Sequence, residues 1–309
     1  MPDEVIRIIA GPTAAGKSAI ALALAERHGA LIVSADSRQV YRGFDIGTAK
    51  PSSAERARAP HVGIDLAAPH ERYSAARWAA EAARWLVEAS AAGRPALVVG
   101  GTGLWLRALV QPLASEAPMD ADRRRALQAA LVELSTPELR RWVHELDPAR
   151  AGPRQGRTQL LRAAEVALLT GTRLGDRLAE AARQQTRRAA RWLIVDPGPE
   201  LHESIANRID AMLAAGWVDE VRALMGDVPP DAPAWNACGY REIRDVVEGR
   251  RTLDEARHAI LVSTRQYAKR QRTWFRHQLG ADDEVTRMDP RAVDAADIAE
   301  QWFTGRARA

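Results

Sequence analysis

The sequence predicts an α/β fold in which a doubly wound parallel sheet carries an inserted all-helical lobe. In the first third of the chain, short apolar runs alternate with amphipathic helical patterns, as in parallel strands joined by helices. From residue 112 to about residue 190 only helical periodicity remains. We therefore expect a core domain of residues 1–111 and 191–309, and a helical insertion domain of residues 112–190.

Four apolar runs are expected to form strands: "VIRIIA", "ALIVSAD", "PALVVGG" and "RWLIVDP", which are residues 5–10, 30–36, 95–101 and 191–197. A helix is expected from Lys17, and a polar loop up to about residue 58. Apolar residues at three-to-four spacing predict the other helices at residues 74–93, 122–134, 137–146, 157–171, 200–216, 239–250 and 253–279.

The composition is that of a soluble globular protein, since 46% of the 309 residues are hydrophobic and 27% are charged. The chain opens with acidic residues, and Arg107 interrupts the longest apolar stretch, so we expect no targeting segment, no membrane contact and a cytoplasmic location. Cys238 is the only cysteine, which excludes an intramolecular disulfide and a cysteine-based zinc site.

The motif "GPTAAGKS", Gly11 to Ser18, lies between the first strand and the first helix. This spacing is typical of a phosphate-binding P-loop, in which backbone N–H groups, a helix N-terminus, Lys17 and Ser18 surround an anion. The core is therefore expected to be P-loop NTPase-like. The motif indicates a diphosphate but leaves open a nucleotide kinase, an NTPase and an enzyme for which diphosphate is a leaving group.

Lysine is rare in this chain. Of its 44 cationic side chains only Lys17, Lys50 and Lys269 are lysines. A compact ammonium contacts phosphate oxygens that a planar guanidinium would crowd, which explains a lysine in the P-loop. The same argument makes Lys50 and Lys269 candidates for a function.

Other polar residues follow the predicted strands. Asp36 ends the second strand and Thr102 follows the third, so both are expected beside the P-loop at the carboxyl edge of the sheet. Asp36 could act as a general base or could only form a turn. Asp196 is the only aspartate in the strand-end position that P-loop hydrolases use for Mg²⁺, which weakens the hydrolase interpretation. In "GGTGLWL" Leu106 replaces the third glycine of a dinucleotide site, which excludes that site.

Six segments resemble, in order and at comparable spacing, the tRNA dimethylallyltransferase (tRNA isopentenyltransferase) family. They are "GPTAAGKS", "DSRQVYRGFDIGTAKP", "VGGTGLWLRAL", "MLAAGWVDEVRAL", "CGYREI" and "STRQYAKRQRTWFR". The resemblance covers nearly the whole chain. It implies transfer of a dimethylallyl group from dimethylallyl diphosphate to N6 of the adenosine just 3′ of the tRNA anticodon.

The resemblance also implies the site residues. Asp36, Thr102 and Lys17 would be catalytic, and Ser18 would hold Mg²⁺ together with diphosphate oxygens. The diphosphate site would consist of Gly11, Thr13, Ala14, Ala15, Gly16, Lys17 and Ser18. The contacts to tRNA would be Asp36, Ser37, Arg38, Gln39, Thr102, Arg124, Thr158, Gln159, Leu160, Leu161, Arg162, Asn236, Ala237, Cys238, Gly239, Tyr240, Arg241, Arg265, Gln266, Lys269 and Arg270. The chain departs from the family pattern at Val62, Trp105 and Gln159.

The implied reaction fits the chemistry of these residues. The leaving diphosphate gains negative charge, which N–H groups, Lys17 and Mg²⁺ stabilise. Asp36 would take the N6 proton, and the adenosine must leave its stack to reach it. Two alternatives remain open, a small-molecule transferase such as a nucleotide kinase or an adenylate isopentenyltransferase, and a non-catalytic RNA-binding protein. The arginine-rich insertion and the polar residues Gln266, Tyr267 and Gln271 among the cations favour tRNA. We expect a monomer.

Overall fold

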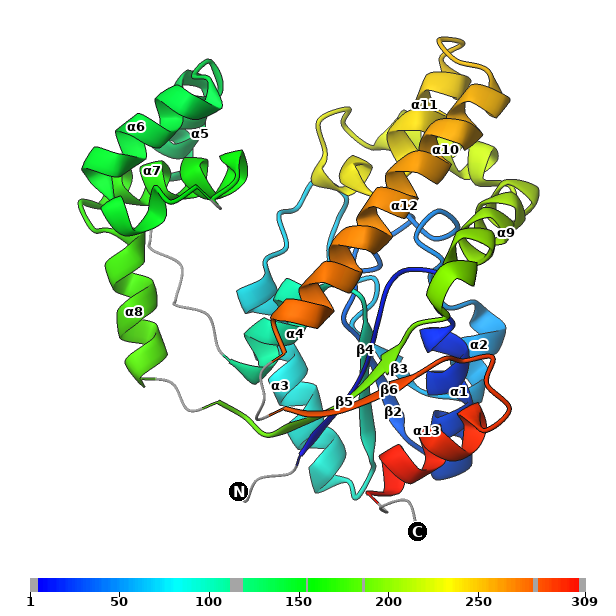
Figure 1. The fold of residues 1–309 in the computed structure, drawn as a ribbon. Helices are drawn as coiled ribbons and strands as arrows, with labels where there is room; N and C mark the ends of the chain where they lie inside the picture. Colours follow the sequence, from blue (N-terminus) through cyan, green and yellow to red (C-terminus); the bar gives the residue numbers. More distant parts are fainter. Residues whose placement is uncertain (1–4, 112–118, 154, 185–186, 280–282, 306–309) are drawn as a thin grey trace. The chain divides into compact units, whose positions relative to one another are not determined.

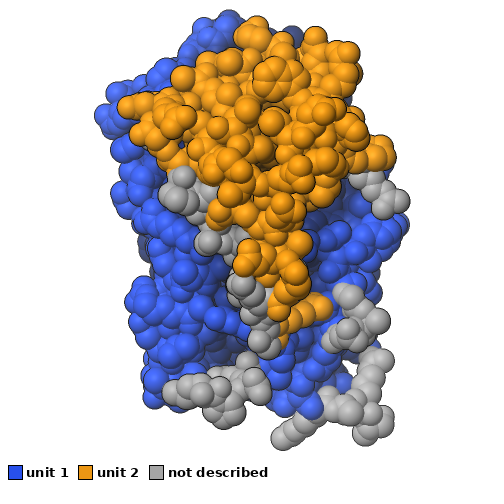
Figure 2. All heavy atoms as spheres, turned by 90° about the vertical axis from the view of Figure 1, so that its left-hand side faces the viewer, with its two compact units in different colours: residues 1–110, 188–309 blue, residues 111–187 orange. Residues whose placement is uncertain are grey.

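The protein is described here from a computed structural model that covers residues 5–111, 119–153, 155–184, 187–279 and 283–305. The chain divides into two compact units, residues 1–110 with 188–309 and residues 111–187. Figure 2 colours these units blue and orange. The sequence places the two boundaries at residues 111 and 191.

A six-stranded parallel sheet forms the centre of the larger unit, with strand order β3-β2-β4-β1-β5-β6. Its strands are β1 (Ile6–Ala10), β2 (Leu31–Ser34), β3 (His61–Val62), β4 (Ala96–Gly100), β5 (Ala190–Val195) and β6 (Glu284–Met288). Ile8 of β1 lies in register with Val98 of β4 and Trp192 of β5, and all three are fully or nearly fully buried. The predicted doubly wound parallel α/β fold is confirmed.

Helices cover both faces of this sheet, with α1 and α13 on one side and α3 and α4 on the other (Figure 1). A group of helices that includes α9 to α12 stands at the carboxyl end of the strands. The helices of this unit are α1 (Lys17–His28), α2 (Ser53–Arg58), α3 (Ala75–Ala91), α4 (Gly103–Val110), α9 (Leu201–Ala214), α10 (Trp217–Asp227), α11 (Tyr240–Val247), α12 (Leu253–His277) and α13 (Ala295–Thr304), with the short 3-10 helices η2 (Gly198–Glu200) and η3 (Pro233–Asn236).

Some elements were not expected from the sequence. The edge strands β3 and β6 are short or polar, and the helix α2 interrupts the stretch predicted as a polar loop. Sequence periodicity is weak in such segments because only one side of an edge strand is paired and a six-residue helix has less than two turns. These elements complete the sheet and its cover without changing the fold class.

The smaller unit is helical throughout the part that is described. It contains α5 (Ala121–Val132), α6 (Thr136–Leu146), the 3-10 helix η1 (Pro148–Arg150), α7 (Arg157–Thr170) and α8 (Leu174–Gln184). Its core consists of buried apolar side chains from α5, α6 and α7, with Leu139 and Leu160 completely buried. Among the described residues of both units, no helix is long and apolar enough to cross a membrane.

Candidate active site

The P-loop connects β1 to α1 and lies at the carboxyl edge of the sheet, between the ends of β4 and β5. Gly11 has φ of 150°, and a Cβ atom there would lie 2.1 Å from the carbonyl oxygen of Val195, so only glycine fits. Gly16 has φ of 86° and starts α1. Between them Ala14 also has positive φ, at 61°. The loop therefore has an unusual backbone shape that turns toward the start of the helix.

Lys17 lies in the first turn of α1 and is mostly buried. Its Nζ donates to the carbonyl oxygen of Pro12 at 2.6 Å, across the P-loop. Burial, and after it the positive charge of Arg208, lower the pKa of Lys17 to about 7, although the charge of Asp36 acts in the opposite direction. An anion in the loop would favour the charged form of this lysine.

Asp36 follows β2 and forms a turn. Its Oδ1 accepts the N–H groups of Arg38 at 2.8 Å and Gln39 at 3.4 Å. Among the described residues, only Oδ1 of this carboxylate accepts hydrogen bonds, and Asp36 lines the cavity at the sheet edge. One carboxylate oxygen thus holds the turn while the other is left for a ligand, so the two interpretations of Asp36 are compatible.

Thr102 follows β4 and lines the same cavity. Its Oγ1 accepts the N–H of Ser37 at 3.3 Å, which links the loops after β2 and β4. Tyr267, on α12, lines the same cavity beside Thr102. Burial and the charge of Asp36 raise the pKa of Tyr267 to about 12, so its hydroxyl stays protonated at neutral pH. The sequence suggested Tyr267 only as a polar residue among the RNA-binding cations of this segment.

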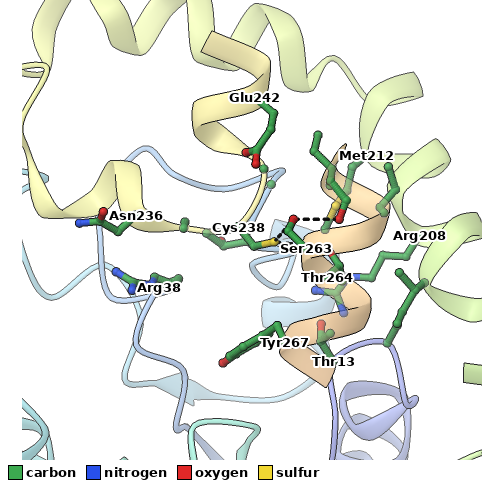
Figure 3. A pocket seen from close by; sticks show the side chains of 18 of the residues that line it. Thr13, Arg38, Arg208, Met212, Asn236, Cys238, Glu242, Ser263, Thr264 and Tyr267 are labelled. Atoms are coloured by element: carbon green, nitrogen blue, oxygen red, sulfur yellow. Dashed lines mark hydrogen bonds between the residues drawn. The ribbon is translucent and has the colours of Figure 1, made fainter. Parts of the chain in front are cut away.

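Arg208 is a site residue that sequence reasoning missed. It lies on α9, is mostly buried, and lines the cavity together with Thr13 (Figure 3). Asp36 lines the same cavity. Burial lowers the pKa of Arg208, and the charge of Asp36 partly opposes this effect. Within the described chain no hydrogen bond or ion pair engages its guanidinium. A desolvated cation without such a partner is suited to bind an anion.

The cavity has a volume of about 530 Å³. One wall is apolar and is formed by side chains of α9, α10 and α12: Ile205, Ile209, Met212, Trp217 and Ile260. The opposite side carries polar and charged groups from the loops after β1, β2 and β4. This volume and this mixture of surfaces are typical of a site for a small organic ligand.

The loop that follows Asp36 is held by polar contacts within itself and by a carboxylate of α10. The Lys50 ammonium is buried and contacts the carbonyl oxygen of Tyr41 at 2.8 Å, Asp65 at 2.7 Å and Asp45. Glu220 of α10 accepts the N–H groups of Asp45 and Ile46 at 3.0 and 2.6 Å. Lys50 thus has a structural role. The sequence had suggested a function for it because lysine is rare in this chain.

Residues 236–241 were predicted to contact tRNA, and in the structure all of them except Tyr240 line the cavity. Asn236, Ala237, Cys238, Gly239 and Arg241 line the cavity. Tyr240 is completely buried, and its hydroxyl donates to Glu220 at 2.6 Å. The prediction of a direct contact is therefore wrong for Tyr240, because no atom of it reaches the surface.

Helix α12 presents the predicted cations to solvent. Arg265, Gln266, Lys269 and Arg270 are exposed, and Arg270 also lines the cavity beside the ring of Tyr267. Gln271, which the sequence suggested as a polar residue among these cations, is buried. It lies on the side of the helix that packs against the sheet edge.

The predicted tRNA contacts of the helical unit differ in exposure and in their bonding partners. Thr158 and Gln159 are exposed, and Gln159 accepts the N–H of Gly156 at 2.9 Å, which caps α7. Arg124 and Arg162 both contact the buried carboxylate of Glu165, at 3.1 and 3.3 Å. Leu161 is partly buried.

Leu160 is completely buried in the core of this unit, so the prediction that it contacts tRNA directly is wrong. Trp105, another position where the chain departs from the family pattern, is 4% exposed and stacks on Trp78 with ring centroids 5.3 Å apart. The indole ring of Trp105 thus fills the core between α3 and α4. Val62 is partly buried in β3.

The groups available to a metal ion are few. The described residues contain no cluster of three or more His, Cys, Asp or Glu side chains that could hold one. Arg272 holds both carboxylate oxygens of Asp196, so this aspartate is neutralised by an ion pair. The Ser18 hydroxyl is exposed at the start of α1. This donor set fits Mg²⁺ that takes most of its ligands from water and from phosphate oxygens.

Comparison with known families gives one match, to the IPP transferase model over residues 39–278. The chain is similar to the tRNA dimethylallyltransferases of Deinococcus radiodurans, with 40% identity over 91% of this chain and 93% of that protein, and of Halorhodospira halophila, with 45% identity over 87% and 89%.

Solved structures show the same fold. The tRNA isopentenylpyrophosphate transferase of Bacillus halodurans superimposes with a TM-score of 0.68 at 30% identity, over 98% of each chain. A eukaryotic dimethylallyltransferase that acts on tRNA superimposes with a TM-score of 0.77 at 22% identity, over 98% of this chain and 80% of its own. The family model covers more than half of the chain and the curated relatives nearly all of it, so this protein belongs to the IPP transferase family.

Proposed function

We propose that the protein transfers the dimethylallyl group of dimethylallyl diphosphate to N6 of the adenosine just 3′ of the tRNA anticodon, with release of diphosphate. One observation carries this proposal: Thr13, Asp36, Thr102 and Arg208 line a single cavity that also has an apolar wall. An anion site, a carboxylate and an apolar surface are the groups that a prenyl transfer to an amine needs.

Arg208, which lines the cavity, and Lys17, in the P-loop, would bind the diphosphate. Lys17 and Arg208 are mostly buried, so their charges act through a medium of low dielectric constant and stabilise the negative charge that develops as the C–O bond breaks. Mg²⁺, held by Ser18 and diphosphate oxygens, would neutralise part of the same charge. The dimethylallyl chain would lie against the apolar wall.

Asp36 would act on the acceptor. As the bond from N6 to the allylic carbon forms, N6 must lose a proton, and the carboxylate of Asp36 accepts it. Thr102 fixes the loop that carries this carboxylate through its bond to the N–H of Ser37. The lone pair of N6 is delocalised into the purine, so the base must be held close to both the carboxylate and the allylic carbon.

The RNA would be held outside the cavity. Arg265, Lys269 and Arg270 of α12 are exposed cations, which suit phosphate contacts. Arg38 and residues 236–239 line the cavity and are placed to contact the extruded nucleotide. In the helical unit, the exposed Thr158 is a further candidate for a contact to the anticodon stem-loop, whereas Arg162 contacts Glu165.

The test is incubation of the purified protein with unmodified tRNA, dimethylallyl diphosphate and Mg²⁺, followed by mass analysis of nucleosides. We expect N6-isopentenyladenosine in tRNA and in an isolated anticodon stem-loop, and very little product from AMP. Efficient prenylation of AMP would instead indicate an adenylate isopentenyltransferase. Phosphoryl transfer from ATP at about 1–100 per second would indicate a kinase.

A further inference from the structure

Gln271 is buried between α12 and the edge of the sheet, where it is 6% exposed. Its Oε1 accepts the N–H of Thr13, in the P-loop, at 2.9 Å. Its Nε2 donates to the carbonyl oxygen of Gly101, after β4, at 2.9 Å. One side-chain amide therefore joins three segments that are far apart in the sequence.

The bond to Thr13 completes the attachment of the first half of the P-loop. Gly11 packs against the backbone of Val195, and Lys17 holds the carbonyl oxygen of Pro12. Gln271 holds the next N–H group along the chain. Because the Thr13 N–H is used in this way, the backbone at Thr13 is held from behind while its side chain lines the cavity.

Because Gln271 lies so close to Gly101, no side chain larger than that of glycine fits at position 101. A Cβ atom on Gly101 would lie 2.3 Å from Nε2 of Gln271 and 3.0 Å from the carbonyl oxygen of Gly11. The neighbour of Gly101 is Thr102, which bonds to the loop of Asp36. The amide of Gln271 thus sets the distance between the P-loop and the loop after β4.

We propose that Gln271 is a positioning residue, which holds the Thr13 backbone and Gly101 in the arrangement that binds diphosphate. Only an amide of this length offers an acceptor to the P-loop and a donor to the Gly101 carbonyl at once. This role rests on the P-loop being the diphosphate site of the proposed function. It differs from the role of the exposed cations on α12, because Gln271 is not accessible to RNA.

The first test replaces Gln271 by Met, which keeps the length of the side chain and removes both hydrogen bonds. Binding of inorganic diphosphate with Mg²⁺ is measured by calorimetry, and we expect the Kd to rise by about tenfold or more, because two buried polar groups lose their partner. The KM for dimethylallyl diphosphate should rise in parallel, while the KM for tRNA stays unchanged. Gln278→Met is the matched control, because Gln278 is the C-cap of the same helix and its exposed side chain accepts one hydrogen bond, from Arg107, among the described residues.

A folded Gln271→Met protein that binds diphosphate as tightly as the unsubstituted protein would overturn the proposal. Equal increases in the KM values for both substrates would also contradict it, since they would indicate a general loss of structure. Because inorganic diphosphate binding does not require prenyl transfer, this measurement stays decisive even if the enzyme uses another diphosphate ester.

The second test needs no substitution and applies even if Gln271→Met does not fold. Amide exchange of the ligand-free protein is followed by NMR, and the Thr13 N–H should exchange at least about a hundredfold more slowly than an unprotected amide. Exchange of Thr13 at the unprotected rate would show that Gln271 does not hold it, and the proposal would then be wrong.

Discussion

The two cations Lys17 and Arg208 differ from the arginines of the helical unit in how their charge is compensated. Lys17 and Arg208 are mostly buried, and neither forms an ion pair within the described residues. Arg124 and Arg162 are also partly buried, but both contact Glu165. Desolvated cations without a carboxylate in contact are arranged for a ligand, whereas paired ones hold the fold. Burial alone therefore does not distinguish a binding residue from a structural one.

The largest expected effect is at Asp36, whose negative charge acts on both Lys17 and Arg208. Asp36→Asn keeps the Oδ1 that holds the turn but removes the base, so single-turnover rates should fall by about 10²–10⁴-fold with tRNA affinity retained. Asp231→Asn, at an exposed carboxylate outside the cavity, is the control. Near-normal rates for Asp36→Asn would remove this residue from the mechanism.

The next largest effect should come from one of the cations. Arg208→Gln removes the charge at the cavity wall, and we expect the single-turnover rate to fall by about 10²–10³-fold, as for other losses of a preorganised charge. Arg222→Gln on α10 is the matched control, because Arg222 is exposed and paired with Asp219. Equal single-turnover rates for the two variants would show that the lack of an ion-pair partner does not mark Arg208 as a catalytic cation.

The pH dependence tests the second cation. With its pKa lowered to about 7, Lys17 is charged below that pH and loses its proton above it in the free protein. Diphosphate binds the charged form, so its affinity should weaken by about tenfold between pH 7 and pH 8.5, after correction for ionisation of the ligand. A flat profile would indicate that Lys17 stays charged throughout. Lys17→Ala should show weak binding without this dependence.

A smaller effect is expected from the exposed cations of α12. Replacing Arg265, Lys269 and Arg270 by Ala should raise the KM for tRNA and reduce the salt dependence of binding, by about 0.7–0.9 in logarithmic slope for each lost phosphate contact. The KM for dimethylallyl diphosphate should change little. An unchanged salt slope would mean that this face of α12 is only solvated.

The smallest effect is expected where the charges are paired. Arg162→Ala leaves Glu165 with Arg124 and Gln128, so the free energy of unfolding should fall by only about 1 kcal/mol. Chemical denaturation measures this change. A much larger loss in tRNA affinity than in stability would show that Arg162 exchanges Glu165 for a phosphate, and would assign it to binding.

Some of the site could be predicted because the chemistry is local in the sequence. The P-loop spacing determines its own conformation, and Asp36 and Thr102 follow strands, whose carboxyl ends meet at one edge of a parallel sheet. Arg208 could not be predicted in this way. It is one arginine among many and lies inside an amphipathic helical pattern, so only the packing of α9 against the sheet edge distinguishes it.

The same limit explains the residues that were misinterpreted. Gln271 stands in a basic segment, which suggested RNA contacts, and the family resemblance implied a tRNA contact for Tyr240. Both are buried and hydrogen-bonded to distant segments. Leu160 belongs to the core of the helical unit. Sequence alone does not show which side of a helix such a residue occupies when the helix packs on more than one neighbour.

The sequence by itself determined the fold class, the P-loop and the resemblance to the family, because each depends on residue types at short, fixed spacings. Only the tertiary structure decided which cations are desolvated, which carboxylates compensate them, and which amide joins α12 to the P-loop. These properties depend on distances between segments up to 258 residues apart, as between Thr13 and Gln271. Electrostatic and hydrogen-bond energies follow such distances in space, and no local pattern encodes them.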